Sequence, residues 1–238
     1  IALLAEPVLR LGGIRITPAT GCRQRTFRFT GLQVQPTAGG AALRVALPAG
    51  ARTGLPVFSH DGKRFAFGRD LVDGVELWGG ETATGSARPV AGVRLNDVLG
   101  PPITWTGAGP LIVRTIPKGR GPAPQAPVIP TGPIVEETAG KASQMATFQD
   151  LLRTPHDAAL FEHYAQAQIA IVDPATAAVT PLGEPGLYAD VEPSPDGRYL
   201  LVQRGKAPFS TRVPFFYFAR STEVWDTAGH RVATVADL

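Results

Sequence analysis

The chain has almost no cysteine and no long apolar run. Cys22 is its single cysteine, which excludes an internal disulfide and a cysteine-based metal site, and its four histidines are scattered rather than set at ligand spacing. We therefore expect no metal and no other cofactor. No stretch approaches the roughly 20 apolar residues of a membrane span. The chain also begins without Met or a basic n-region. These absences predict a soluble chain that starts inside a longer protein, with no targeting or transmembrane segment and no membrane partner, and they leave its compartment unknown.

Charged residues are also scarce, at 18% of 238 residues, whereas there are 27 glycines and 23 prolines. This balance favours many short strands joined by tight turns over long helices. Residues 1–70 hold 10 Lys and Arg against 3 Asp and Glu, and the rest hold 13 against 17. Nucleic-acid-binding proteins concentrate basic residues on one surface, with aromatic residues among them. We interpret the asymmetry as solvated strand faces and expect no nucleic-acid partner.

An internal repeat is the most informative feature. One copy is SHDGKRFAF at residues 59–67, continued at residues 75–78, and the other is SPDGRYLLV at residues 194–202, continued at residues 222–225. Each copy predicts a strand, a tight turn at the Asp-Gly pair, and two further strands, because glycine tolerates the positive φ of such a turn. Asp61, Asp196 and His60 are therefore expected to be turn residues and not catalytic groups.

A degenerate third copy lies at residues 105–113, with later strands expected at residues 168–173 and 179–182. The distance from Ser59 to Thr106 is 47 residues and from Thr106 to Ser194 it is 88, which fits one repeat plus an insertion. Four short strands in each unit of about 45 residues indicate a β-propeller. Alternating segments at residues 27–34 and 43–47 would belong to a preceding blade. The expected fold is all-β: residues 1–238 form a partial β-propeller of about three to four blades, with an open edge, where a closed propeller has about 4–8 blades.

The insertion is expected at residues 117–166, within the middle blade. Its first part, residues 116–133, is rich in proline, which enforces extended backbone and excludes a helix. Its second part has apolar residues at helical spacing and predicts two short helices, at residues 147–152 and 157–164. Thr147 and Asp157 would cap them, and Pro155 would separate them. His163 in the second helix is expected to be a surface histidine or a histidine with satisfied hydrogen bonds, and not a ligand.

Several longer motifs carry a specific resemblance. They are TIPxxRG at residues 115–121 with the prolines that follow, TFQDLL at 147–152, DAxLFxxY at 157–164, LxLGGIRI at 9–16, RxRxxxFTGL at 23–32, PFS at 208–210 and EVW at 223–225. Together these motifs resemble the glutamyl endopeptidase branch of the prolyl oligopeptidase family of serine peptidases. The resemblance extends over nearly the whole chain.

The resemblance implies a propeller followed by an α/β-hydrolase domain, whose Ser-Asp-His triad cleaves peptides after glutamate. A peptide substrate and that C-terminal domain would then be the partners. None of the six serines lies in a Gly-x-Ser-x-Gly nucleophile elbow, so we expect no catalytic residue in this chain. The hydrolase domain then lies beyond Leu238 or has been lost. The expected function is to limit peptide access to the triad. The alternative is a free-standing propeller-like module that binds a protein or peptide without catalysis.

Cleavage after glutamate requires a cation near the glutamate carboxylate, and a planar guanidinium offers it two aligned donors. Arg120 and Lys118 are the predicted substrate-binding residues, since their loop carries Gly119 and Gly121, which allow close approach to a ligand. Alternatively, Arg120 pairs with an acidic side chain or a loop carbonyl and only fixes the loop. Weaker candidates are the arginines of the basic opening, namely Arg15, Arg23 and Arg25.

Overall fold

The computed structural model describes residues 6–24, 27–107, 109–127 and 148–238. Twelve of its strands form three four-stranded antiparallel sheets in which sequential strands are neighbours. Blade A contains β6 (Val57–Phe58), β7 (Arg64–Leu71), β8 (Gly74–Glu81) and β9 (Ala87–Arg94). Blade B contains β10 (Ile103–Trp105), β11 (Leu111–Thr115), β12 (Ala167–Asp173) and β13 (Ala178–Gly186). Blade C contains β14 (Tyr188–Pro193), β15 (Tyr199–Gly205), β16 (Arg220–Asp226) and β17 (Arg231–Asp237).

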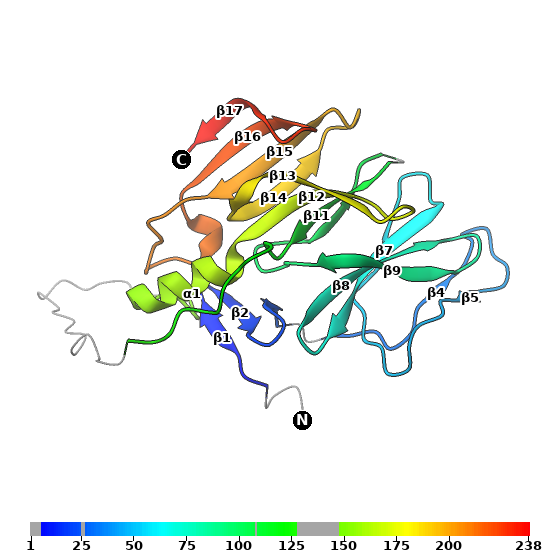
Figure 1. Cartoon of the computed structure of the whole chain (residues 1–238), viewed down its shortest axis with the longest axis horizontal. Helices are drawn as coiled ribbons and strands as arrows, with labels where there is room; N and C mark the ends of the chain where they lie inside the picture. Colours follow the sequence, from blue (N-terminus) through cyan, green and yellow to red (C-terminus); the bar gives the residue numbers. More distant parts are fainter. Residues whose placement is uncertain (1–5, 25–26, 108, 128–147) are drawn as a thin grey trace, which may run out of the picture.

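The three blades lie side by side as a fan that is not closed (Figure 1). Strand β10 contacts both β6 and β14, so the first strand of each blade is the inner one and β9, β13 and β17 are outer edges. The hairpin of β4 (Gln33–Val34) and β5 (Leu43–Arg44) lies before blade A, and Phe29 bridges to Thr53, which bridges to Arg69 of β7. The predicted all-β fold of partial propeller blades is confirmed.

The repeated turns have the same hydrogen bonds in blades A and C. The Ser59 hydroxyl donates to Asp61 Oδ1 at 2.6 Å and accepts from the Arg64 amide at 2.9 Å. In blade C the Ser194 hydroxyl donates to Asp196 Oδ1 at 2.6 Å and accepts from the Tyr199 amide. The glycine that follows each aspartate has a positive φ, 66° at Gly62 and 70° at Gly197. These contacts assign the repeated Ser and Asp to turn formation.

Apolar faces between the sheets form the core. One cluster fills the space between blades A and B, and it includes Leu77, Leu95, Trp105 and Leu111. A second cluster lies between blades B and C around Tyr188, Leu200 and Trp225. The outer face of blade A packs on the β4–β5 hairpin through a third cluster. Each sheet thus buries its apolar face against the next one, as expected for stacked repeats.

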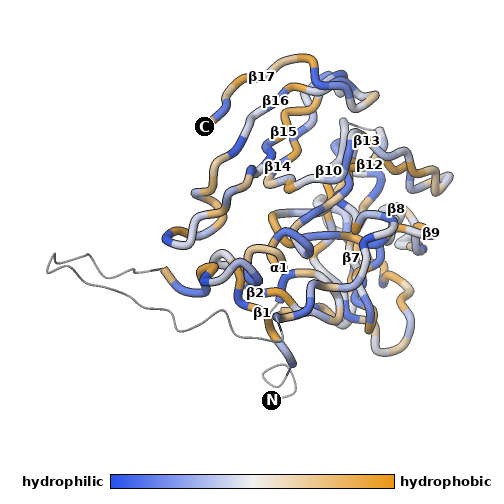
Figure 2. Tube along the Cα trace, turned by 60° about the vertical axis from the view of Figure 1, so that its left-hand side comes forward, coloured by the Kyte–Doolittle hydropathy of each residue, from blue (hydrophilic) through white to orange (hydrophobic). Residues whose placement is uncertain are grey.

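Long connections gather at one end of the blades, which we call the insertion face. It consists of residues 95–102, 116–127, 148–166 and 206–219 together with β1 (Leu9–Leu11), β2 (Ile14–Thr17) and β3 (Cys22–Arg23). Figure 2 shows α1 (Pro155–Ala165), β1 and β2 grouped there. A separate apolar cluster that includes Ile16, Val98 and Phe161 holds these segments together. The short turns, at residues 59–63, 106–110 and 194–198, leave the strands at the opposite end.

The insertion departs from the sequence prediction in its helices. The described chain between β11 and β12 holds a single α-helix, α1. Residues 148–153 form neither helix nor strand, and Asp150 has a φ of 59°, so the helix predicted at residues 147–152 is wrong in its described residues; Thr147 lies outside them. Thr154 is the N-cap, Pro155 is the first helical residue, and Asp157 completes the capping box, so Pro155 starts the helix instead of separating two. Among the described residues, no helix is long and apolar enough to cross a membrane.

Candidate functional site

A cleft of about 670 Å³ opens at the insertion face between the outer strands of blades A and B. Its charged or aromatic lining residues are Asp73, Arg94, Lys118, Arg120, His163 and Tyr164. They come from the β7–β8 turn, the end of β9, the loop after β11 and the last turn of α1. Two of the predicted substrate-binding residues, Arg120 and Lys118, therefore lie in one cleft.

The loop that carries Arg120 turns sharply just after β11. The Arg120 amide donates to the Pro117 carbonyl at 3.2 Å, and Gly119 has a φ of 84°, a conformation that favours glycine. Gly21 leaves the room that the guanidinium occupies, because a Cβ at Gly21 would lie 2.6 Å from Arg120 Nη2. The backbone thus holds Arg120 against the wall of the cleft and leaves Lys118 exposed at its mouth.

The guanidinium of Arg120 has an unusual environment. Its Cζ lies 5.6 Å from the centre of the Tyr164 ring, which is within the range of a cation–π contact. Its Nη1 is buried and has no hydrogen-bond partner among the described residues. Burial lowers the pKa of Arg120, because the charged form loses hydration. A buried donor without a partner suits a site that binds an acceptor from outside the chain.

Helix α1 positions the aromatic side of the cleft. Tyr164 is buried in the apolar cluster of the insertion face, and the Asn96 side chain donates to the carbonyls of Tyr164 and Gln166, both at 2.9 Å. The His163 ring contacts the Tyr164 ring edge-on, with centroids 4.9 Å apart. Burial, and then the positive charge of Arg120, lower the pKa of His163. The lowered pKa favours the neutral imidazole of His163.

The arginines of the opening lie elsewhere. Arg15 Nε donates to Asp150 Oδ2 at 3.0 Å, a contact that joins β2 to the residues before α1. Arg23 Nε donates to the Val98 carbonyl at 2.7 Å, and burial lowers its pKa. Both guanidinium groups thus contact groups of the same chain and neither lines the cleft. Arg25 is outside the described residues.

Three further residues of the cleft are not predicted as binding residues by the sequence: Asp73, Arg94 and Tyr164. They lie far apart in the sequence and in different elements, and no motif connects them to Lys118 and Arg120. His163 was noticed but interpreted as a surface histidine. The one sequence feature that indicates a place for His163 in the cleft is its position beside Tyr164, near the end of a predicted helix.

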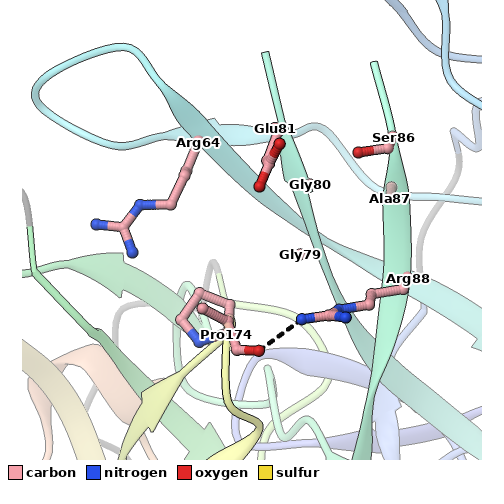
Figure 3. Close-up of a pocket in the computed structure, with 9 residues that line it drawn as sticks. Arg64, Gly79, Gly80, Glu81, Ser86, Ala87, Arg88 and Pro174 are labelled. Carbon is pink, nitrogen blue, oxygen red and sulfur yellow. Dashed lines mark hydrogen bonds between the residues drawn. The ribbon is translucent and has the colours of Figure 1, made fainter. Parts of the chain in front are cut away.

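A second pocket, of about 340 Å³, lies between blades A and B at the opposite end, and its lining includes Arg64, Glu81, Ser86 and Arg88 (Figure 3). Arg88 donates to the Ala175 carbonyl of blade B, and Arg64 donates to the Gly109 carbonyl at 3.1 Å. These contacts join the two blades. In the described ranges no group of three His, Cys, Asp or Glu side chains could hold a metal ion.

Comparisons with known proteins show a relation along the whole chain. The chain is 32% identical over 250 residues to the probable chloroplastic glutamyl endopeptidase of Oryza sativa subsp. japonica. The aligned region covers 99% of this chain and 26% of that protein. It is 32% identical over 252 residues to the protein of the same description from Arabidopsis thaliana, which covers 100% of the chain and 26% of that protein. The chain therefore spans about a quarter of the length of these curated relatives.

No family model matches the chain. Among solved structures, the acylaminoacyl peptidase of Pyrococcus horikoshii is similar, with a TM-score of 0.51 and 13% sequence identity over 87% of this chain and 28% of that one. At this identity the likeness shows the fold alone, and it agrees with the blades described above.

Proposed function

We propose, since this chain belongs to the glutamyl endopeptidase branch of the prolyl oligopeptidase family, that it is the propeller portion of a serine peptidase and limits peptide access to a Ser-Asp-His triad. In this proposal residues 1–238 form a partial propeller domain, residues 117–166 are an insertion in it, and a C-terminal α/β-hydrolase domain outside this chain supplies the triad. The observation that carries the proposal is the match of the whole chain to two glutamyl endopeptidases, at 32% identity.

The insertion face is the surface best suited to meet that hydrolase domain. Its exposed aromatic residues Phe148, Phe216 and Tyr217 contact one another, with ring centroids 5.8 Å apart for Phe148 and Tyr217 and 4.8 Å apart for Phe216 and Tyr217. A contiguous exposed aromatic patch is typical of an interaction surface. The opposite end of the blades carries mainly short polar turns. In this arrangement the cleft opens on the side of the propeller that faces the catalytic domain.

Within the proposal, Arg120 and Lys118 bind the carboxylate of the substrate glutamate. The partly buried guanidinium with its unpartnered Nη1 supports this role, since no carboxylate or carbonyl of the described residues accepts from that atom. The alternative, that Arg120 pairs within the chain and only fixes its loop, lacks such a partner for Nη1. Arg15, Arg23 and Arg25 stay weaker predictions, and the first two already contact the chain itself.

The test is Arg120→Ala in the full-length protein. We expect the activation barrier derived from kcat/KM to rise by about 1.5–3 kcal/mol for a Glu-Xaa peptide, the range of a charge-assisted hydrogen bond. The barrier for the matching Gln-Xaa peptide should change much less. Arg44→Ala, on the exposed strand β5, is the matched control and should leave both values unchanged.

Three results would contradict the proposal in different ways. Equal losses on both peptides would mean that Arg120 organises structure. Unchanged values on both would remove it from the site. A full-length protein that binds peptides but hydrolyses none would be a binding module instead of a peptidase.

A further inference from the structure

The cleft carries more positive charge than one substrate carboxylate needs. Arg94, Lys118 and Arg120 line it as permanent cations, and Asp73 is the single carboxylate among its described lining residues. No ion pair joins any of the three cations to a carboxylate within the described ranges. These three cations and one carboxylate give the lining two net positive charges, and one bound glutamate compensates only one of them.

The size of the cleft points the same way. At about 670 Å³ it lies well inside the range of about 300–1,000 Å³ that is typical of ligand clefts, and one glutamate side chain would fill only part of it. Pro117, Pro181 and Pro185 form rigid parts of its walls, and Gln168 adds a neutral polar side chain. The cleft therefore has room for several residues of a peptide.

The cations also differ in their positions. Arg120 lies partly buried beside Tyr164, whereas Lys118 is exposed in the same loop and Arg94 comes from the end of strand β9. Because Arg94 comes from a different element, a second carboxylate on a neighbouring residue of the peptide can bind there while the first is held at Arg120 and Lys118. A neutral side chain at the second position would gain nothing from the remaining charge.

We infer that the cleft recognises an acidic peptide segment with two acidic residues: one carboxylate binds at Arg120 and Lys118, and the second binds at Arg94. This inference rests on the proposed function, which assigns the cleft to a substrate carboxylate, and it extends that function by naming the substrate class. The second acidic residue acts through charge and contact at the rim of the cleft, so it contributes to affinity and not to the chemistry of cleavage.

Equilibrium binding to the full-length protein, with the serine of its proposed triad changed to alanine, tests the inference without any catalytic step. Four acetylated and amidated hexapeptides differ only at two central positions, which are Glu-Glu, Glu-Gln, Gln-Glu or Gln-Gln, and calorimetry gives each Kd at low salt. We expect Glu-Glu to bind about tenfold more tightly than either peptide with one Glu, the fold-change for one modest charge-assisted contact. These peptides should in turn bind more tightly than Gln-Gln, and 0.5 M salt should weaken the preference.

Variants separate the two positions. Arg94→Gln should abolish the advantage of the second Glu and leave binding of the one-Glu peptides nearly unchanged, whereas Arg120→Gln should weaken both classes. Arg44→Gln serves as the control for a lost exposed arginine, and circular dichroism confirms that each variant is folded.

Each outcome decides one of the two claims. If Glu-Glu binds no better than a peptide with one Glu, while one Glu still binds better than Gln-Gln, the inference fails and the proposed carboxylate site stands. If the four wild-type affinities are equal, or none of the peptides binds, the carboxylate site itself fails and the inference fails with it.

Discussion

The guanidinium of Arg114 joins two connections between blades, and its loss should destabilise the whole fan. Arg114 lies on β11 and is 4% exposed. Its Nε and Nη2 donate to the Pro101 carbonyl, before β10, and its Nη1 donates to the carbonyls of Tyr188 and Ala189 in β14, at 2.8 and 3.0 Å. Burial lowers its pKa to about 10, so it is charged at pH 7. One side chain of β11 thus holds both the connection that leads into blade B and the first strand of blade C.

Arg114→Met keeps the length of the side chain and removes every donor. The three carbonyls then lose their partner in the interior, where an unsatisfied polar group costs about 1–3 kcal/mol. These losses are not fully additive, so we take the lower part of their combined range of about 3–9 kcal/mol. We expect the free energy of unfolding to fall by about 3–5 kcal/mol, a large part of the about 5–15 kcal/mol that stabilises a typical domain.

Urea unfolding followed by tryptophan fluorescence measures this loss, because Trp78, Trp105 and Trp225 are all buried in the blades. The control is Arg198→Met, an arginine whose side chain is 74% exposed and pairs with Asp196 in a turn, and which should cost less than about 1 kcal/mol. If Arg114→Met lowered the free energy of unfolding no more than the control did, at an unchanged m-value, the reasoning that Arg114 stabilises blade B and its contact with β14 would be refuted.

Two smaller changes test α1 and the cleft. Thr154→Ala removes the hydroxyl that accepts from the Asp157 amide at 3.0 Å, so it should lower the free energy of unfolding by about 1 kcal/mol in the same urea assay, whereas the exposed Thr37→Ala should not. Equal losses in the two variants would argue against the cap. Arg120→Gln removes a positive charge that disfavours the imidazolium form, so the pKa of His163 measured by NMR titration should rise toward its ordinary value. A pKa that stays unchanged or falls would show that Arg120 does not act on His163.

The blades could be predicted from the sequence because their signals are local. In each clear copy the Ser hydroxyl, the Asp carboxylate and the amide five residues after the Ser lie within one turn, and Gly62 and Gly197 supply the positive φ that the turn requires. Such contacts join residues that are close in the sequence, so they are visible there as a motif. Their spacing along the sequence then sets the order of the strands, and the 88-residue interval located the insertion.

The predicted helix at residues 147–152 is wrong because apolar spacing alone does not distinguish a helix from an irregular segment held by tertiary contacts. Leu152 is buried in the cluster of the insertion face and Phe148 contacts the Tyr217 ring, which lies about 70 residues away. The Gly13 amide donates to the Asp150 carbonyl, so this segment finds its hydrogen bond in the N-terminal hairpin. Thr154 and Pro155 carry the sequence signal for the start of α1, whereas Pro155 is predicted above to separate two helices.

By itself, the sequence determined the β-propeller repeats, the place of the insertion and the choice of Arg120 and Lys118, because turn chemistry and loop composition are properties of consecutive residues. Only the tertiary structure decided what surrounds these two side chains. It brought Arg94 and His163 to the same cleft and gave Arg15 and Arg23 partners within the chain. The reason is physical: burial, charge balance and an unpartnered donor arise from packing between elements far apart in the sequence, and no local pattern encodes them.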